Sequence, residues 1–147
     1  MAMQSDSSAG SYDFAALGEE SGELERLQLQ ARRSAELELQ LLRRMGLKDG
    51  LDVLDLACGP GVITRLIAES HPSSRVTAMD LNEALLEQAK SEAVAVGLNT
   101  IHFVRGDVYQ PPLPEASFDF IYARLLFQHL DQPSKALDQV RRLLKPG

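Results

Sequence analysis

Short apolar runs alternate with helical patterns from residue 52 to the end of the chain. The apolar runs, which are typical of buried strands, occupy residues 53–57, 75–79, 101–105 and 118–123. Helical patterns follow a Gly-Pro-Gly turn at residues 59–61 and the helix cap Asn82, and a last one covers residues 134–144. Strands that alternate with helices favour parallel β-α-β units with right-handed crossovers. The pattern therefore predicts an α/β fold with a doubly wound, Rossmann-like, mostly parallel sheet.

The connection between the third and fourth predicted strands limits the order of the strands. Residues 108–117 form this connection, and their extended length is about 33 Å. A strand order of 3-2-1-4 needs a path of about 22 Å, which crosses the intervening strands and returns along one of them. The order 3-2-1-4 is therefore within reach, and we expect it.

The chain before residue 52 has a different pattern. Residues 1–20 are rich in Ser, Gly, Ala and Asp, which is typical of a flexible terminal segment. Residues 22–45 lack Pro and carry acidic residues in the first turn and arginines in the last, which indicates helix. Leu37, Leu41 and Met45 form an apolar stripe, and a change of phase near residues 33–34 indicates a bend or two helices. We therefore divide the chain into a flexible N-terminal segment, 1–20, and one domain with N-terminal helices, 21–147.

Composition and charge narrow the class of function. The chain has 147 residues, of which 44% are hydrophobic and 24% charged, as in ordinary globular domains. Its net charge of −6 is evenly spread, which argues against a protein that binds mainly nucleic-acid phosphates. The sequence has no apolar run of about 20 residues for a membrane span, and its single cysteine, Cys58, fits a reducing compartment. We expect a cytoplasmic protein that acts on a small molecule, with no metal site, no membrane contact and no nucleic-acid partner.

The most informative segment is a strand that runs into a glycine turn at the start of a helix. Gly59 and Gly61 have no Cβ, so the backbone there can approach a ligand closely, and free amides at the helix start can bind a carboxylate. Asp80 follows Gly61 after 19 residues and closes the second strand, where a carboxylate can accept hydrogen bonds from both ribose hydroxyls. Asp107 closes the third strand and adds a carboxylate to the same rim. These residues predict a binding site for a nucleoside-containing ligand.

Six segments of the chain resemble the class I S-adenosylmethionine-dependent methyltransferase family, in particular its small methyltransferase-domain branch of the ubiquinone-biosynthesis type. The segments are Val53-Leu54-Asp55-Leu56-Ala57-Cys58-Gly59-Pro60-Gly61, Ala78-Met79-Asp80, Phe103-Val104-Arg105-Gly106-Asp107, Ser117-Phe118-Asp119, Phe127-Gln128-His129-Leu130 and Leu143-Leu144-Lys145-Pro146-Gly147. Ala57 replaces the first of the family's three turn glycines. The resemblance implies S-adenosylmethionine as cofactor and in-line transfer of its methyl group to an O, N or C nucleophile.

The same resemblance implies a role for individual residues. Gly59 and Gly61 would border the methionine part of the cofactor, Asp80 the ribose, and Asp107 with Val108 the adenine. The expected cofactor-binding residues are Tyr12, Asp55, Ala57, Cys58, Gly59, Gly61, Asp80, Leu81, Gly106, Asp107, Val108 and Arg124. His129 is the candidate general base, since it follows the fourth strand and imidazole titrates near neutral pH. The alternative for His129 is a packing or rim histidine, and Cys58 is expected to be a small turn residue rather than a nucleophile.

Two alternative functions stay open at this point. A NAD(P)-binding Rossmann domain shares the glycine turn and the acid about 20 residues later. Thr64 stands where such a domain has its third glycine, and Asp55 where it has an apolar residue, and both differences count against it.

The second alternative is a truncated, non-catalytic cofactor-binding or interaction module. In the resembled family, a fifth strand and further helices follow the segment that ends this chain, so we expect a domain that is incomplete at its C-terminus. The fourth strand would then be an edge, and Phe118, Phe120, Ile121 and Tyr122 would meet solvent or another chain. We expect the N-terminal helices or self-association into a homo-oligomer to cover this surface.

Overall fold

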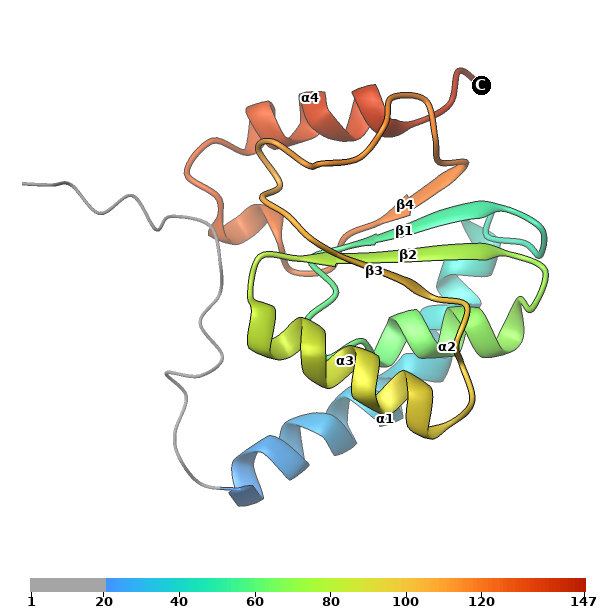
Figure 1. Ribbon diagram of the computed structural model, residues 1–147, viewed down its shortest axis with the longest axis vertical. Coiled ribbons are helices and arrows are strands. Elements are labelled where there is room, and N and C mark those ends of the chain that lie inside the picture. The colour runs from blue at the N-terminus through green and yellow to red at the C-terminus, as the bar shows by residue number, and fades with distance from the viewer. Residues whose placement is uncertain (1–20) are drawn as a thin grey trace, which may run out of the picture.

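A computed structural model describes residues 21–147 (Figure 1). Its elements are α1 (Ser21–Arg44), β1 (Asp52–Leu56), α2 (Val62–Ser70), β2 (Arg75–Asp80), α3 (Glu83–Ala95), β3 (His102–Arg105), β4 (Phe120–Tyr122), the 3-10 helix η2 (Phe127–His129) and α4 (Pro133–Leu143). Residues 1–20, including the expected cofactor residue Tyr12, lie outside the described residues.

The strands form one parallel sheet with the order β3-β2-β1-β4. This confirms the predicted order 3-2-1-4 and the Rossmann-like fold class. In the register of the sheet, Asp55 on β1 lies between Ala78 on β2 and Tyr122 on β4. Residues in register on neighbouring parallel strands point to the same face, so Asp55 and Tyr122 share one face of the sheet.

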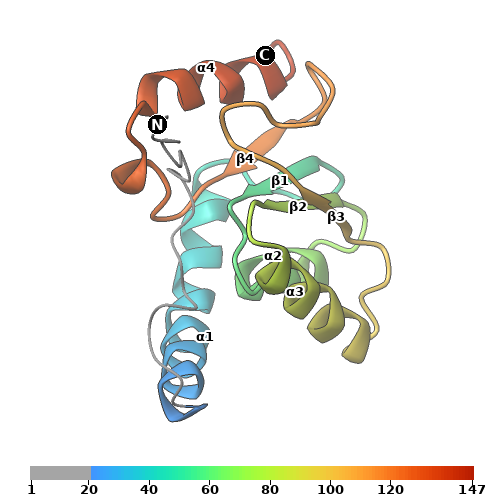
Figure 2. The same cartoon turned by 60° about the vertical axis from the view of Figure 1, so that its left-hand side comes forward.

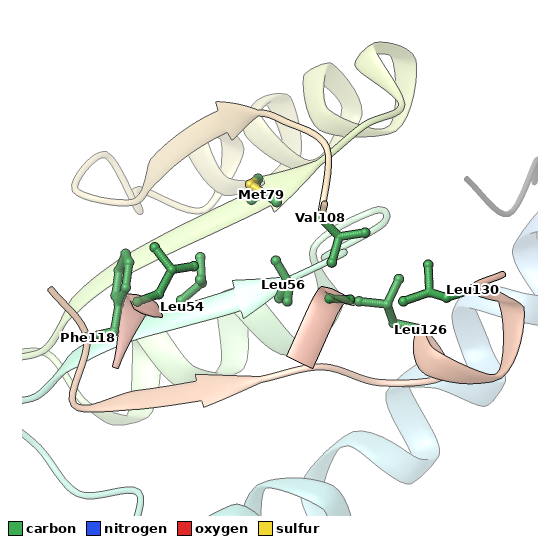
Figure 3. Packing of buried hydrophobic residues seen from close by; sticks show 9 residues of the cluster. Leu54, Leu56, Met79, Val108, Phe118, Leu126 and Leu130 are labelled. Carbon is green, nitrogen blue, oxygen red and sulfur yellow. The ribbon is translucent and has the colours of Figure 1, made fainter. Parts of the chain in front are cut away.

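Helices cover both faces of the sheet, as a doubly wound fold requires. The helices α1, α2 and α3 lie on one side, and α4 lies on the other (Figures 1 and 2). Leu54 and Leu56 of β1 belong to a hydrophobic cluster on the α4 side of the sheet. Val53, which points to the opposite face, belongs to a second cluster on the side of α1 and α2. Figure 3 shows part of the α4-side cluster, in which Val108, Leu126 and Leu130 gather beyond Leu56. Each face of β1 is therefore buried, which explains its almost continuous apolar run.

The helix α1 is a single uninterrupted helix, so the predicted alternative of two helices is wrong. The stripe that packs is also different from the predicted one. Ala35, Leu39 and Leu42 are buried against α2 and β1, whereas the predicted Leu37 and Met45 are 69% and 68% exposed. Ala35 is 1% exposed, Leu39 8% and Leu42 3%, so these are the side chains that the contact with α2 and β1 buries.

The expected exposed surface at β4 is mostly covered within the chain. Phe118 is only 6% exposed, and Phe120 and Tyr122 pack against the cluster that contains α1. Phe118, which precedes β4, forms backbone hydrogen bonds with the C-terminal residues of the chain. Phe118 N donates to Leu143 O (3.1 Å), and Lys145 N donates to Phe118 O (2.9 Å). The expectation that these side chains meet solvent or another chain is therefore wrong for Phe118, because the chain's own helix and C-terminal residues supply the cover. Among residues 21–147, no helix is long and apolar enough to cross a membrane.

Candidate functional site

The turn after β1 has the left-handed backbone that glycine favours. The φ angles of Ala57, Gly59 and Gly61 are 63°, 53° and 74°. A Cβ at Gly61 would lie 2.8 Å from the Cβ of Ala89 on α3, so glycine is needed there for α2 and α3 to pack. A Cβ at Gly59 would meet nothing within 4 Å. The Cβ side of Gly61 therefore faces α3, whereas Gly59 is open on its Cβ side, where a ligand can approach the backbone.

Asp80 ties this turn to the end of β2. Its Oδ2 accepts a hydrogen bond from Gly59 N at 2.8 Å, and its Oδ1 accepts one from Asn82 N at 2.8 Å. The residue is only 9% exposed, so its carboxylate has a fixed orientation. Each carboxylate oxygen has a second lone pair, which leaves capacity for two hydroxyl donors. The next residue, Leu81, is 38% exposed and gives the rim an apolar side chain.

Asp55 lies beneath the turn and is 3% exposed. The hydroxyl of Thr64 on α2 donates a hydrogen bond of 2.6 Å to its Oδ2. Burial raises the pKa of Asp55 to about 7, the charges of Asp80 and Glu38 also raise it, and the Thr64 hydrogen bond opposes the rise. Thr64 stands where a dinucleotide-binding turn has its third glycine. Here its hydroxyl serves as a hydrogen-bond donor to the carboxyl group of Asp55 on β1.

Cys58 is half-buried within the turn. Burial, followed by the charges of Asp55 and Asp80, raises the pKa of its thiol far above the ordinary value. The reactive thiolate form is therefore disfavoured at neutral pH. These surroundings suit a small turn residue, as expected, and not a nucleophile.

The rim after β3 is built by Gly106, Asp107 and Val108. The Gly106 amide donates a hydrogen bond of 3.1 Å to Asp80 O, and a Cβ at Gly106 would lie 2.5 Å from Pro112 Cδ. Asp107 is exposed, and its Oδ1 accepts a hydrogen bond from Tyr109 N at 2.9 Å. The Val108 side chain is 7% exposed and points into the core, as Figure 3 shows. Val108 therefore offers the rim its backbone rather than its side chain.

The rim after β4 carries Arg124, which pairs with Glu38 of α1. Arg124 Nη1 lies 3.2 Å from Glu38 Oε2, and the Tyr122 hydroxyl donates a hydrogen bond to Glu38 Oε1. Burial, and then the hydrogen bond to Glu38, raise the pKa of Tyr122 far above its usual value. Sequence reasoning missed Glu38, because it lies in a helix rich in Glu and Leu and matches no motif.

The candidate base His129 ends η2 and is exposed. Its Nε2 lies 3.1 Å from Gln128 Nε2. Within residues 21–147, no group of three or more His, Cys, Asp or Glu side chains is arranged to hold a metal ion. The site therefore consists of backbone amides, carboxylates and one arginine, gathered at the carboxyl ends of the parallel strands.

Comparison with known proteins agrees with this arrangement. A family model described as "Methyltransferase domain" matches residues 53–147, from β1 to the end of the chain. The chain belongs to this family. The resemblance to class I S-adenosylmethionine-dependent methyltransferases is thereby confirmed, and the methyltransferase interpretation is favoured over a NAD(P)-binding domain.

Individual relatives have the same character. The chain is 36% identical over 111 residues to a sterol 24-C-methyltransferase of Gibberella zeae, an alignment that covers 75% of this chain and 29% of the relative. It is 34% identical over 116 residues to a malonyl-[acyl-carrier protein] O-methyltransferase of Pseudescherichia vulneris, covering 79% of this chain and 42% of the relative. A crystal structure of a SAM-dependent methyltransferase from Aquifex aeolicus superposes with a TM-score of 0.74 at 26% identity, covering 88% of this chain and 69% of that one. The chain thus spans less than half the length of these two curated relatives.

Proposed function

We propose that the chain is the cofactor-binding part of an S-adenosylmethionine-dependent methyltransferase that acts on a small molecule. The observation that carries this proposal is the pair of hydrogen bonds, each 2.8 Å, that hold Asp80 against the backbone of Gly59 and Asn82. They pre-orient a carboxylate beside an open glycine turn, as recognition of a ribose next to a methionine chain requires.

The residues of the site fit this cofactor in shape and charge. Gly59 leaves the backbone open, and the carboxylates of Asp80 and Glu38 outnumber the neighbouring cation, Arg124. A site with an excess of carboxylates favours a ligand with cationic groups. The exposed side chain of Leu81 supplies an apolar surface beside Asp80 for a planar base. Donor types and charge therefore both suit S-adenosylmethionine.

The proposed work of the protein is to hold and align groups. Bound S-adenosylmethionine supplies a methyl group on a positively charged sulfur, which needs no further activation by the protein. Gly59, Gly61 and Asp80 hold the methionine and ribose parts, while Asp107 and the Val108 backbone hold the adenine. This fixes one partner of an in-line displacement and lowers the entropic part of the barrier. His129 on η2 is the proposed base for acceptors that must lose a proton.

The acceptor is proposed only as a class. The relatives described above are named for a sterol and for malonyl-[acyl-carrier protein], so they differ in the molecule that they methylate. The net charge of −6 gives this chain no excess of basic side chains with which to bind nucleic-acid phosphates. A small-molecule acceptor is therefore the proposal.

Three lesser proposals concern surroundings and completeness. A homo-oligomer would form through the backbone edge of β4, which is the last strand of the sheet. A cytoplasmic location is supported by the free thiol of Cys58, which suits a reducing compartment. The third is the alternative of a cofactor-binding module without activity of its own; the chain spans 29% and 42% of the two curated relatives described above, so the activity of the whole protein is itself a proposal.

Thermal unfolding with added ligands tests the main proposal. S-adenosylhomocysteine at about 100 times its Kd should stabilise the folded chain by about 2.7 kcal/mol, which raises Tm by several degrees. NAD at the same concentration should leave Tm unchanged. Asp80→Asn should raise the Kd of S-adenosylhomocysteine about tenfold, because one carboxylate acceptor is lost, and so reduce the stabilisation to about 1.4 kcal/mol. The variant Asp131→Asn, at an exposed position outside the site, is the control. Stabilisation by NAD alone would show that the proposal is wrong.

A further inference from the structure

Glu38 and Arg124 form an ion pair between α1 and the carboxyl end of β4. The two side chains are 17% and 40% exposed, so the carboxylate is mostly enclosed and the guanidinium reaches solvent. Glu38 is further fixed by the Tyr122 hydroxyl, which donates to its Oε1 from 84 residues away in the sequence. Figure 2 shows the later part of α1 reaching the sheet near β4 and β1. The hydrogen bond from Tyr122 places Glu38 at this contact.

Glu38 and Arg124 have opposite charges, but one carboxylate oxygen of Glu38 lacks a hydrogen bond. Glu38 Oε2 is buried, and among the described residues it accepts no hydrogen bond, although Arg124 Nη1 lies 3.2 Å away. A buried carboxylate oxygen without a hydrogen bond is costly, because water no longer solvates it. Oε2 is therefore able to accept a hydrogen bond from a donor that residues 21–147 do not supply.

The position of the pair relates it to the glycine turn. Tyr122 is in register with Asp55, and the charge of Glu38 is close enough to act on Asp55 beneath the turn. Glu38 also lies outside residues 53–147, so the match to the family model does not account for it. It is a feature of this chain's own N-terminal helix.

We propose that Glu38 and Arg124 bind the amino-acid end of the cofactor, Glu38 holding its ammonium group and Arg124 its carboxylate. This inference rests on the proposed function and assigns one end of the ligand to named side chains. An amino-acid zwitterion carries one charge of each sign, so it can replace the internal pair without leaving a charge unmatched. Arg124 is exposed enough to turn towards a carboxylate, while Tyr122 keeps Glu38 in place. The ammonium group then donates to Oε2, the oxygen that now lacks a hydrogen bond.

Three ligands that differ only at this end separate the two contacts. S-adenosylhomocysteine has both the ammonium and the carboxylate, decarboxylated S-adenosylhomocysteine keeps only the ammonium, and 5′-methylthioadenosine has neither; all three are neutral at the sulfur. Calorimetric titration of the whole chain measures the Kd of each. The variants are Glu38→Gln and Arg124→Gln, and Glu36→Gln, at an exposed position on the same helix, is the matched control.

The expected pattern is specific to each variant. Glu38→Gln should raise the Kd of S-adenosylhomocysteine and of decarboxylated S-adenosylhomocysteine about tenfold or more, as for the loss of a charged hydrogen bond. Arg124→Gln should raise the Kd of S-adenosylhomocysteine by a similar factor but leave that of decarboxylated S-adenosylhomocysteine within about twofold. Neither variant should change the Kd of 5′-methylthioadenosine, and Glu36→Gln should change none of the three.

The outcomes separate the two proposals. If the wild-type chain binds none of these ligands, the proposed function itself is wrong. If wild type binds all of them but Glu38→Gln weakens 5′-methylthioadenosine as much as S-adenosylhomocysteine, Glu38 has only a structural role. This inference is then overturned while the proposed function stands. An equal effect of Arg124→Gln on ligands with and without the carboxylate would overturn the assignment of Arg124.

Discussion

The carboxyl group of Asp55 and the hydroxyl of Thr64 are joined by a hydrogen bond of 2.6 Å in the buried space between β1 and α2. Thr64 is fully buried, and Asp55 is 3% exposed. An acid that carries a charge in such a place loses much of its hydration. The pKa of Asp55 is accordingly raised to about 7, so the group titrates near neutral pH.

The pH dependence of stability should reveal this buried acid. The folded pKa of about 7 lies above the unfolded value of 3.8, so between these pH values the folded chain holds a proton that the unfolded chain has lost. The stabilisation is complete below pH 3.8 and is lost as pH rises through 7. The free energy of unfolding that Asp55 contributes changes over this range by on the order of 4 kcal/mol. Asp55→Asn should remove it, so the variant should gain stability relative to wild type from pH 4 to pH 8.

Urea unfolding at pH 4, 5.5, 7 and 8 provides the measurement. Asp131→Asn, at an exposed position, controls for the general change of charge. Parallel pH profiles for wild type and Asp55→Asn would contradict the prediction.

Thr64→Val tests the other partner of the same hydrogen bond. The valine keeps the shape of the side chain but removes the donor, so a buried carboxyl oxygen loses its partner. We expect a loss of about 1 to 3 kcal/mol in the free energy of unfolding. The Thr64 hydrogen bond lowers the pKa of Asp55, so the pH midpoint of the wild-type dependence should also move upwards in the variant. An unchanged midpoint in the same urea series would show that the hydroxyl does not act on Asp55.

Gly61 and Gly59 form a matched pair of positive-φ glycines with different surroundings. Gly61→Ala should destabilise the chain by about 2 to 4 kcal/mol, because backbone strain adds to a clash with Ala89. A Cβ at Gly59 meets open space, so Gly59→Ala should cost only the strain, about 1 kcal/mol. Denaturant midpoints measure both. Equal losses would mean that the approach of α2 to α3 does not depend on Gly61.

Ala57 is a non-glycine residue in a left-handed backbone conformation, with φ at 63°. Its Cβ therefore already carries the strain that the two glycines avoid. Ala57→Gly should relieve this strain, and the greater flexibility of glycine in the unfolded chain should offset part of the gain. The net expectation is an increase of about 0.5 to 1 kcal/mol in the free energy of unfolding. The thermal midpoint should rise accordingly, and a fall would indicate that the alanine methyl group makes packing contacts that outweigh the strain.

The strand order and the glycine turn could be predicted because their signals are local. Each strand with its following helix occupies a short stretch of sequence, and the links between Gly59 and Asp80 follow from the parallel pairing of β1 with β2. The packing face of α1 could not be predicted in this way. Its sequence offers two apolar stripes, and only contact with α2 and β1 selects Ala35 and Leu39 over Leu37.

The hydrogen bond between Tyr122 and Glu38 of α1 was also missed, for a related reason. Glu38 accepts a hydrogen bond from Tyr122, which lies 84 residues later in the sequence, and neither residue lies in a motif. A partner so distant is determined by how the helix packs on the sheet, not by spacing along the chain. The sequence predicted Arg124 as a rim residue, but its ion pair with Glu38 depends on the same packing.

Lys145 forms ion pairs with Asp52 on β1 and with Asp119. Its replacement should lower the free energy of unfolding most near neutral pH. Its Nζ lies 2.7 Å from Asp52 Oδ2 and 2.9 Å from Asp119 Oδ2. Hydrogen bonds from Arg75 and then from Lys145 lower the pKa of Asp52 from 3.8 to about 2. The stability that these contacts contribute is therefore present above pH 3.8 and is lost as pH falls through 2.

Lys145→Gln should raise the pKa of Asp52 and make the chain less stable than wild type at pH 6. The difference should shrink as pH falls through 2, because Asp52 then becomes protonated in both proteins. Urea unfolding at low salt measures it, since added salt would screen these charges. Arg141→Gln is the control, because Arg141 and its partner Asp138 are 74% and 72% exposed and such pairs contribute little. A difference between Lys145→Gln and wild type that is the same at pH 6 and pH 2 would mean that Lys145 stabilises the chain through packing of its stem rather than through its charge.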